Sequence, residues 1–158
     1  MSLLALGCNP EIHGSDIDIL KGVPLGALAY SPDGGLYMAI RNRNGSVTGK
    51  GTLCHLQYSM VLIPTANNAA IGVSIVIPQT QLAANDYGWA LIFGRGEVQV
   101  DNGNTTAANS YAAAVGNAAG QAEHASTTDA ISGLFLATSS GSAGRLVECF
   151  ATFPKKVS

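Results

Sequence analysis

The chain has few charged residues for its length. Lys, Arg, Asp and Glu make up 11 % of its 158 residues, whereas an ordinary soluble domain has about 25 %. The net charge is −2 and no basic patch occurs, which argues against a nucleic-acid partner, because phosphate contacts need clustered Lys and Arg. A surface of Ser, Thr, Asn, Gln and Ala solubilises weakly and suits a protein packed against copies of itself or a partner. A neutral domain without such a partner fits the same composition.

Cysteine and histidine are too sparse and too scattered for a local metal site or a disulfide framework. The three cysteines, Cys8, Cys54 and Cys149, form no CxxC pair, and no two of the three histidines have the spacing of a local metal pair. We therefore expect no metal and no cofactor, while a metal site assembled from distant residues stays open. Cys54 and Cys149 are interpreted as small apolar residues inside strands.

Motifs for catalysis are also absent. The chain has no GxSxG sequence, and Gly94-Arg95-Gly96 is too short for a phosphate loop. The small-residue run Ser139–Ser142 lacks the strand-to-helix setting of a nucleophile elbow. We find no catalytic residues and predict that the protein is not an enzyme.

Targeting and membrane segments are not indicated either. The first residues lack the charged start and the long apolar core of a signal peptide. The longest mostly apolar run, Ala69 to Ile77, is far too short to span a membrane. We expect no membrane partner and a product that is made and kept, or assembled, in a cytoplasm.

Turn residues are plentiful and recur at intervals of about 8–12 residues, a spacing typical of a β-sandwich or barrel. Asn44-Gly45 is the clearest hairpin signal, and no long helical pattern is present. We therefore predict an all-β protein, with a small β-barrel or a jelly-roll-like sandwich over residues 21–158. The expected strands outside the central segment are Val23–Tyr30, Leu36–Arg41, Thr52–Tyr58, Val61–Pro64, Ile71–Ile77, Tyr111–Val115, Ile131–Ala137 and Arg145–Phe153.

The segment Ala83–Val100 is expected to form the centre of the core as a hairpin, with its reversal at Gly94-Arg95-Gly96. Alternation places Tyr87, Trp89, Leu91 and Phe93 on one face and Gly88, Ala90 and Ile92 on the other. Both faces are apolar, so we expect both to be covered. In the last strand, alternation puts Phe153 on the same face as Val147. The predicted core residues are Tyr87, Trp89, Leu91, Phe93, Val98, Ile71, Val73, Ile75 and Val147.

Residues 1–20 differ from the rest of the chain because they combine Gly and Pro with the alternating stretch Ser15–Ile19. We predict an extended N-terminal arm that adds a strand to a neighbouring molecule, and a poorly ordered terminus is an equally good interpretation. The residues expected to contact a partner are Ile12, Asp16, Ile17, Asp18 and Ile19.

A series of landmarks in one order resembles a known class of proteins. Val23-Pro24-Leu25-Gly26 is followed by a turn at Asp33-Gly34, then by Tyr87-Gly88-Trp89, and near the end by Ala130–Leu134. Over roughly Gly22 to Phe153 the chain resembles the small β-rich virion proteins of tailed bacteriophages, the capsid decoration or cement class. The Tyr-Gly-Trp strand is the most specific part of this resemblance.

The resemblance implies a homotrimer that binds the major capsid protein at three-fold or quasi-three-fold positions and stabilises the outer surface of the capsid. It places the protein in the virion, assembled in the host cytoplasm. Deleting residues 1–20 should then weaken capsid binding and leave the core folded. Two alternatives remain: a head-fibre or tail component, and a carbohydrate-binding β module. The second needs an exposed aromatic platform, whereas Tyr87 and Trp89 look buried.

Overall fold

The computed structural model describes residues 7–20, 22–57, 61–64, 72–100, 110–114, 120–124, 130–137 and 145–157. The chain is all-β, as predicted, and one 3₁₀ turn, η1, is the only helical element in the part described. The elements are η1 (Ile17–Leu20), β1 (Leu28–Tyr30), β2 (Leu36–Arg41), β3 (Cys54–Gln57), β4 (Val61–Pro64), β5 (Ile75–Pro78), β6 (Tyr87–Gln99), β7 (Ser110–Ala114), β8 (Ala122–His124), β9 (Ala130–Leu136) and β10 (Leu146–Lys156).

The strands pair in the order β1-β2-β4-β3-β5-β6-β10-β9-β7-β8, and all pairs but one are antiparallel. Because β2 also pairs with β6, the strands β2, β4, β3, β5 and β6 are linked in a circuit. Its weakest link is the parallel β2–β4 contact, a single residue pair between Arg41 and Val61. The whole sheet is not closed, since β1 and β8 stand at its two ends. This arrangement fits the jelly-roll-like sandwich among the predicted folds.

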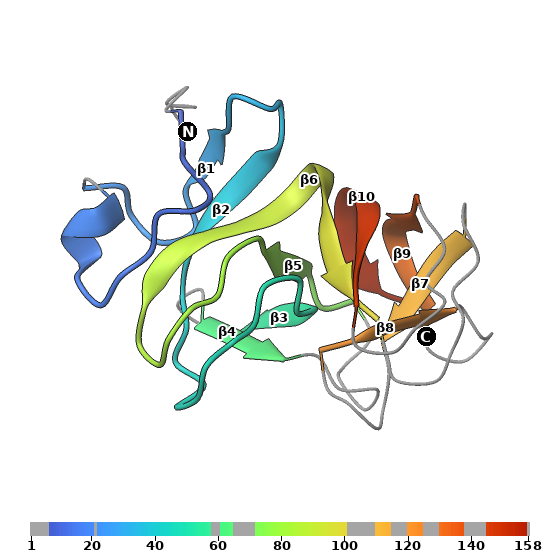
Figure 1. Ribbon diagram of the computed structural model, residues 1–158. Helices are drawn as coiled ribbons and strands as arrows, with labels where there is room; N and C mark the ends of the chain where they lie inside the picture. Colours follow the sequence, from blue (N-terminus) through green and yellow to red (C-terminus); the bar gives the residue numbers. More distant parts are fainter. Residues whose placement is uncertain are drawn as a thin grey trace.

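Strand β6 is one long curved strand and not the predicted hairpin. Its first half pairs with β2, and from Phe93 to Gln99 it pairs with β10. Figure 1 shows β6 sweeping from the strands near the N-terminus to those near the C-terminus. The predicted reversal at Gly94 is wrong because this glycine serves a close approach: its φ is 109°, and a Cβ there would lie 2.9 Å from the Cα of Gly35. The glycine lets two backbones touch while the strand continues.

An extra residue in β6 interrupts the predicted alternation. Tyr37 pairs with Leu91 and Leu36 pairs with Phe93, so Ile92 has no partner on β2 and forms a bulge. Leu91 packs in the main core cluster, whereas Ile92 and the half-buried Phe93 pack with the second. The prediction that Phe93 shares a face with Leu91 is therefore wrong, and the bulge is the reason.

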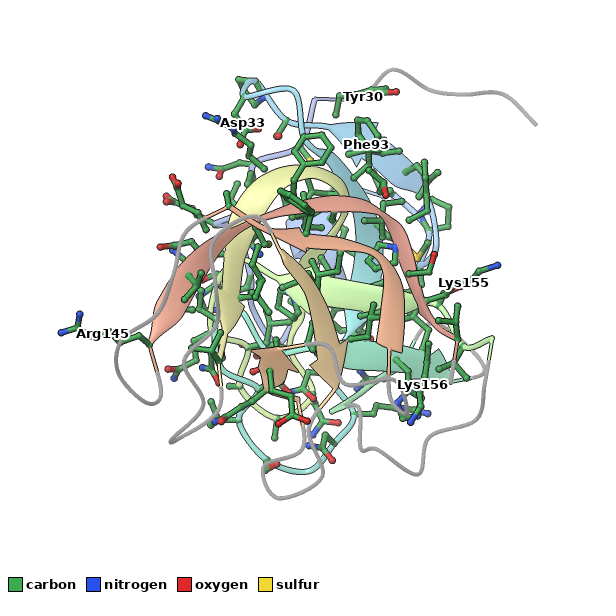
Figure 2. The ribbon with its side chains drawn as sticks, turned by 90° about the vertical axis from the view of Figure 1, so that its right-hand side faces the viewer. Tyr30, Asp33, Phe93, Arg145, Lys155 and Lys156 are labelled. Carbon is green, nitrogen blue, oxygen red and sulfur yellow. The ribbon has the colours of Figure 1, made fainter. Side chains whose placement is uncertain are left out.

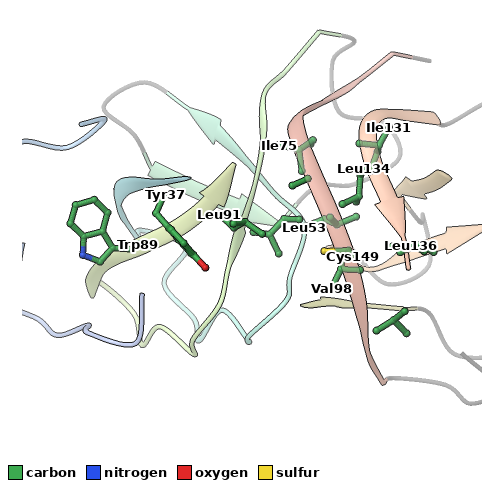
Figure 3. Packing of buried hydrophobic residues seen from close by; sticks show 14 of the residues in the cluster. Tyr37, Leu53, Ile75, Trp89, Leu91, Val98, Ile131, Leu134, Leu136 and Cys149 are labelled. Carbon is green, nitrogen blue, oxygen red and sulfur yellow. The ribbon is translucent and has the colours of Figure 1, made fainter. Parts of the chain in front are cut away.

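The main core cluster runs the length of the molecule, along one side of β6 and under β9 and β10 (Figure 3). The opposite side of β6 is covered by the second cluster around Leu36, Ile40 and Val76. Both faces of β6 are thus buried from Gly88 to Ile92, as the apolar sequence suggests, whereas its later half has one side in solvent. Of the predicted core residues, Trp89, Leu91, Val98, Ile75 and Val147 are buried, Tyr87, Val73 and Phe93 are half-buried, and Ile71 lies outside the described residues.

Strand β8 was not predicted, and three predicted strands differ from the observed ones by three residues or more at one end. β1 is shorter at its start, because the carbonyl of Pro24 accepts a hydrogen bond from the Ala27 amide and makes a turn. β5 begins only at Ile75, because Gly72 adopts a positive φ of 87°. β10 continues through Pro154, which was expected to end it, because a bulge precedes the proline.

Residues 7–20 lie along the β domain of their own chain. Gly7 forms a parallel bridge with Tyr30, and Gly14 forms an antiparallel bridge with Tyr87. Cys8 and Leu20 are buried in the main core cluster. In the single chain, the residues predicted as an extended arm therefore complete the core, and their backbone groups bond to the adjacent strands. In the described part of the chain, no helix has the length and apolar character needed to cross a membrane.

Candidate interaction face

The solvent side of β6, β10 and β9 carries a row of aromatic side chains, and we call it the aromatic face. Alternation along β10 buries Val147, Cys149 and Ala151 and leaves Glu148 and Phe150 exposed. Phe135 on β9 stands directly opposite Phe150. An alternating strand over a buried core thus places large apolar side chains in solvent.

A bulge in β10 turns Phe153 outward. Between Ala151 and Lys155, β10 has four residue steps where the facing stretch of β9 has two. Within this bulge Phe153 has a φ of 52° and is 60 % exposed. A bulky residue in this left-handed region costs about 1–2 kcal/mol. The prediction that Phe153 points inward with Val147 is wrong, because the bulge changes the side to which the strand presents it.

The opposite strand is shaped to fit this bulge. Gly133 of β9 has a φ of 78°, and a Cβ there would lie 2.5 Å from the carbonyl oxygen of Thr152. The hydroxyl of Thr152 donates a 3.3 Å hydrogen bond to the Gly133 carbonyl. A positive φ on each strand and a close backbone approach together hold Phe153 in solvent. A strained backbone conformation persists only where the surrounding structure holds the residue in place. Such conformations are concentrated at functional sites.

Phe93 lies between the two exposed phenylalanines of β10. Its ring centroid is 5.7 Å from that of Phe150, edge to face at 70°, and 5.7 Å from that of Phe153, at an angle of 36°. Such pairs contribute about 0.5–1.5 kcal/mol beyond the burial of their area. Phe150 is 38 % exposed, so the row leaves apolar side chains in solvent. Phe93 and Lys155 are labelled in Figure 2.

A pocket of about 300 Å³ adjoins this aromatic row. Its walls include Phe150 and Phe135, and the buried Cys149 belongs to its lining. Burial raises the pKa of the Cys149 thiol to about 12, so this thiol stays protonated and is a poor nucleophile. The full lining is Arg95, Gly96, Phe135, Ala137, Glu148, Cys149 and Phe150. The pocket can accept an apolar group between an arginine and a glutamate.

The charges around the aromatic face are unevenly paired. Lys50 forms a 2.5 Å ion pair with Glu97, and Glu97 stands directly opposite Glu148 on the next strand. Within the described ranges, neither Glu148 nor Lys155 takes part in an ion pair. Besides the exposed Arg95 of β6, the face therefore offers one carboxylate, Glu148, and one ammonium, Lys155, both on β10 and both in solvent.

The residues predicted to contact a partner lie away from this face, near the start of β6. Ile12 is half-buried, and Asp16 is exposed and accepts a 3.0 Å hydrogen bond from the Asp18 amide. This is a local Asx turn, and both aspartate side chains are exposed. Ile17 and Ile19 belong to η1, and their side chains lie outside the described part of the structure.

Nowhere in the residues that the structure describes do three or more His, Cys, Asp or Glu side chains gather in a way that could hold a metal ion. His13 pairs with Asp86 across 3.2 Å and fastens the N-terminal segment to the loop before β6.

Sequence reasoning missed the aromatic face. The one available signal was Phe150, which alternation sets on the side of β10 away from the predicted core residue Val147. The bulges that place Phe93 and Phe153 leave no local sequence signature that distinguishes them from regular strand.

No protein-family model matches the chain, and no curated protein matches it significantly. Its function must therefore be inferred from the resemblance of its landmarks and from the geometry above.

Proposed function

We propose that the protein is a virion structural protein that decorates and stabilises the outer surface of a phage capsid by binding the major capsid protein at three-fold or quasi-three-fold positions. The capsid as partner comes from the resemblance of the landmarks, and the observation that supports a role in protein contact is the aromatic face, where a strained backbone holds Phe153 in solvent beside an apolar pocket. Aromatic side chains with an arginine nearby are enriched at protein–protein interfaces. The face thus supports a function exerted by contact between proteins.

The composition supports the same function. Only 11 % of the residues are charged. The electrostatic repulsion between copies of the protein, or between the protein and a lattice of subunits, is therefore weak. Many weak uncharged contacts add up when several copies are linked, because each further contact is intramolecular. A protein that binds a repeating surface can therefore hold it without one strong polar site.

The contact with the capsid protein is assigned to the N-terminal segment and the turns beside it. Ile12, Asp16 and Asp18 lie at the end of β6 that begins with Tyr87, whereas the aromatic face covers its later half. The two surfaces are therefore separate (Figure 1). Such a division lets one surface hold the capsid protein while the other holds a further protein.

The test is binding of the purified protein to empty capsids, measured by co-sedimentation over a range of protein concentrations. Saturation at a fixed ratio near one copy per capsid subunit, or per three-fold position, is expected. A variant with Asp16→Lys and Asp18→Lys should bind less tightly, with Arg43→Glu in the loop after β2 as the matched surface control. Failure of the wild-type protein to sediment with capsids would remove the proposal. A low copy number in virions would indicate a head-fibre or tail component.

Carbohydrate binding is the second candidate, because the aromatic face supplies exposed rings that the sequence did not reveal. Trp89 is buried, and the Arg41 guanidinium covers the ring of Tyr87 at 4.8 Å, so neither offers a platform. The rings of Phe93, Phe150 and Phe153 are tilted by 36° and 70° and do not form one flat surface for a sugar. Calorimetric titration with a panel of oligosaccharides would reveal such binding, and heat of binding lost in Phe150→Ala would favour it.

A further inference from the structure

We propose that the aromatic face seats a second copy of this chain in a two-fold pair, with Phe153 of each copy in the pocket of the other and Lys155 of each against Glu148 of the other. The inference rests on the proposed function in one respect, since both treat this face as a surface for protein contact. It goes further by naming the occupant.

The first argument is the match between a projecting side chain and a pocket. Phe153 projects into solvent from a strained bulge. The pocket beside Phe150 has a volume of about 300 Å³, the lower end of the range for ligand pockets and ample for one benzyl group. Its walls, Phe135 and Phe150, are aromatic. Each copy therefore carries both the group to be buried and the place that can bury it.

The second argument is charge complementarity in the order of the residues along β10. Lys155 follows Phe153 by two residues, and Glu148 precedes Phe150 by two residues. Lys155 lies at the end of the β10 bulge, which shortens the strand between it and Ala151, so the correspondence is one of residue order and direction along β10. When two β10 strands face each other in opposite directions, Phe153 of one copy meets Phe150 of the other, and Lys155 then meets Glu148. Neither charge has an ion-pair partner within its own described chain.

The third argument is that the complementary features lie on one strand of one chain. In a two-fold interface, contacts occur in reciprocal pairs, so a surface must be complementary to itself. The segment from Glu148 to Lys155 meets this condition, because its beginning complements its end. The aromatic residue Phe93 lies between the two halves, where the two-fold axis passes. A dimer formed in this way would carry two capsid-binding surfaces, one from each copy.

The experiment is a charge exchange followed by measurement of mass in solution. Sedimentation equilibrium of the wild-type protein should give a concentration-dependent two-fold pair. Lys155→Glu alone, or Glu148→Lys alone, puts like charges together twice per interface and should raise the dissociation constant by about a hundredfold or more. The double variant, Lys155→Glu with Glu148→Lys, restores opposite charges and should recover most of the wild-type affinity. Arg43→Glu, in the loop after β2, is the matched control and should leave the mass unchanged.

A further variant tests the projecting ring. Phe153→Asn keeps a residue that adopts positive φ readily, so the bulge should persist and the protein should fold. It should be monomeric at concentrations where the wild type is paired, and a thermal melt checks that it is folded. A folded Phe153→Asn variant that pairs as tightly as the wild type would overturn the inference.

The remaining outcomes separate this inference from the proposed function. A wild-type monomer at all concentrations, a trimer, or a double variant that stays as weak as the single variants would each overturn the two-fold pair. A monomer that still saturates capsids overturns this inference alone and leaves the capsid function standing. A charge-rescued pair that ignores capsids supports this inference and removes the capsid function. The same mass measurement decides between this two-fold pair and the trimer that the resemblance implies.

Discussion

Replacing Gly94 by alanine should destabilise the protein more than a positive φ alone can explain. Gly94 has a φ of 109°, and a Cβ there would meet the Cα of Gly35 at 2.9 Å. The contact is with backbone, which cannot rotate away as a side chain could. Gly45, at the tip of the loop after β2, also has a positive φ, 67°, but a Cβ there would meet nothing within 4 Å.

The two glycines separate the two costs. A left-handed conformation costs a residue with a Cβ about 1–2 kcal/mol, and both variants bear this cost. Overpacking in a well-packed site adds about 1–3 kcal/mol, and only Gly94→Ala bears it. We therefore expect losses in the free energy of unfolding of about 2–5 kcal/mol for Gly94→Ala and about 1–2 kcal/mol for Gly45→Ala. In a domain of this size, each kcal/mol lowers Tm by about 2–4 °C.

Urea unfolding monitored by circular dichroism measures both losses, and a thermal melt gives the Tm values independently. The slope of the urea transition should not change, because the same surface is exposed on unfolding. Equal losses in the two variants would refute the reasoning, since they would mean that Gly94 occupies an open turn. That outcome would favour a reversal at Gly94 over the continuous strand β6.

Three further predictions concern the buried residues and the N-terminal segment. Iodide should quench the fluorescence of Trp89 weakly in the folded protein and strongly in urea, because its side chain is 5 % exposed; strong quenching of the folded protein would contradict its place in the core. Burial raises the pKa of the Cys8 thiol from 9.0 to about 11 and that of Cys149 from 9.0 to about 12. The unfolded chain therefore releases these protons first, so stability should be full below pH 9 and fall as the pH rises toward 11. The urea midpoint measured at pH 7, 9 and 10 checks this, and a constant midpoint would show that the thiols are not buried. Deleting residues 1–20 should destabilise the fold by several kcal/mol, as loss of a large core side chain does, because Leu20 is 2 % exposed in the core; a deletion variant with an unchanged Tm would restore the view of these residues as a separate arm.

This last prediction differs from the one that the resemblance gave. An arm that serves only a partner could be removed without harm to the core. The structure instead places Cys8 and Leu20 within the core and joins Gly14 to Tyr87 by backbone hydrogen bonds. The apolar residues of this segment show no regular periodicity. The sequence pattern therefore did not predict that two of its residues would be buried by strands far along the chain.

The alternation of side chains determined much of this fold in advance. The all-β class and most strand positions follow from short apolar segments separated by Gly, Pro and Asn, because these residues set local backbone conformations. The buried side of β10 follows as well, since Val147, Cys149 and Ala151 alternate with exposed residues. These properties depend on neighbours in the sequence, and the sequence contains them directly.

The candidate site was decided by pairing between distant strands. Ile92 forms a bulge only because β2 offers one residue fewer than β6 over that stretch. Phe153 points outward only because β10 has extra residues opposite Gly133 of β9. A single extra residue exchanges the two faces of a strand, so register decides which aromatic residues are buried and which are exposed. The sequence by itself determined the strands and their apolar content. The tertiary structure decided where the strands slip against each other, and therefore which side chains form the aromatic face.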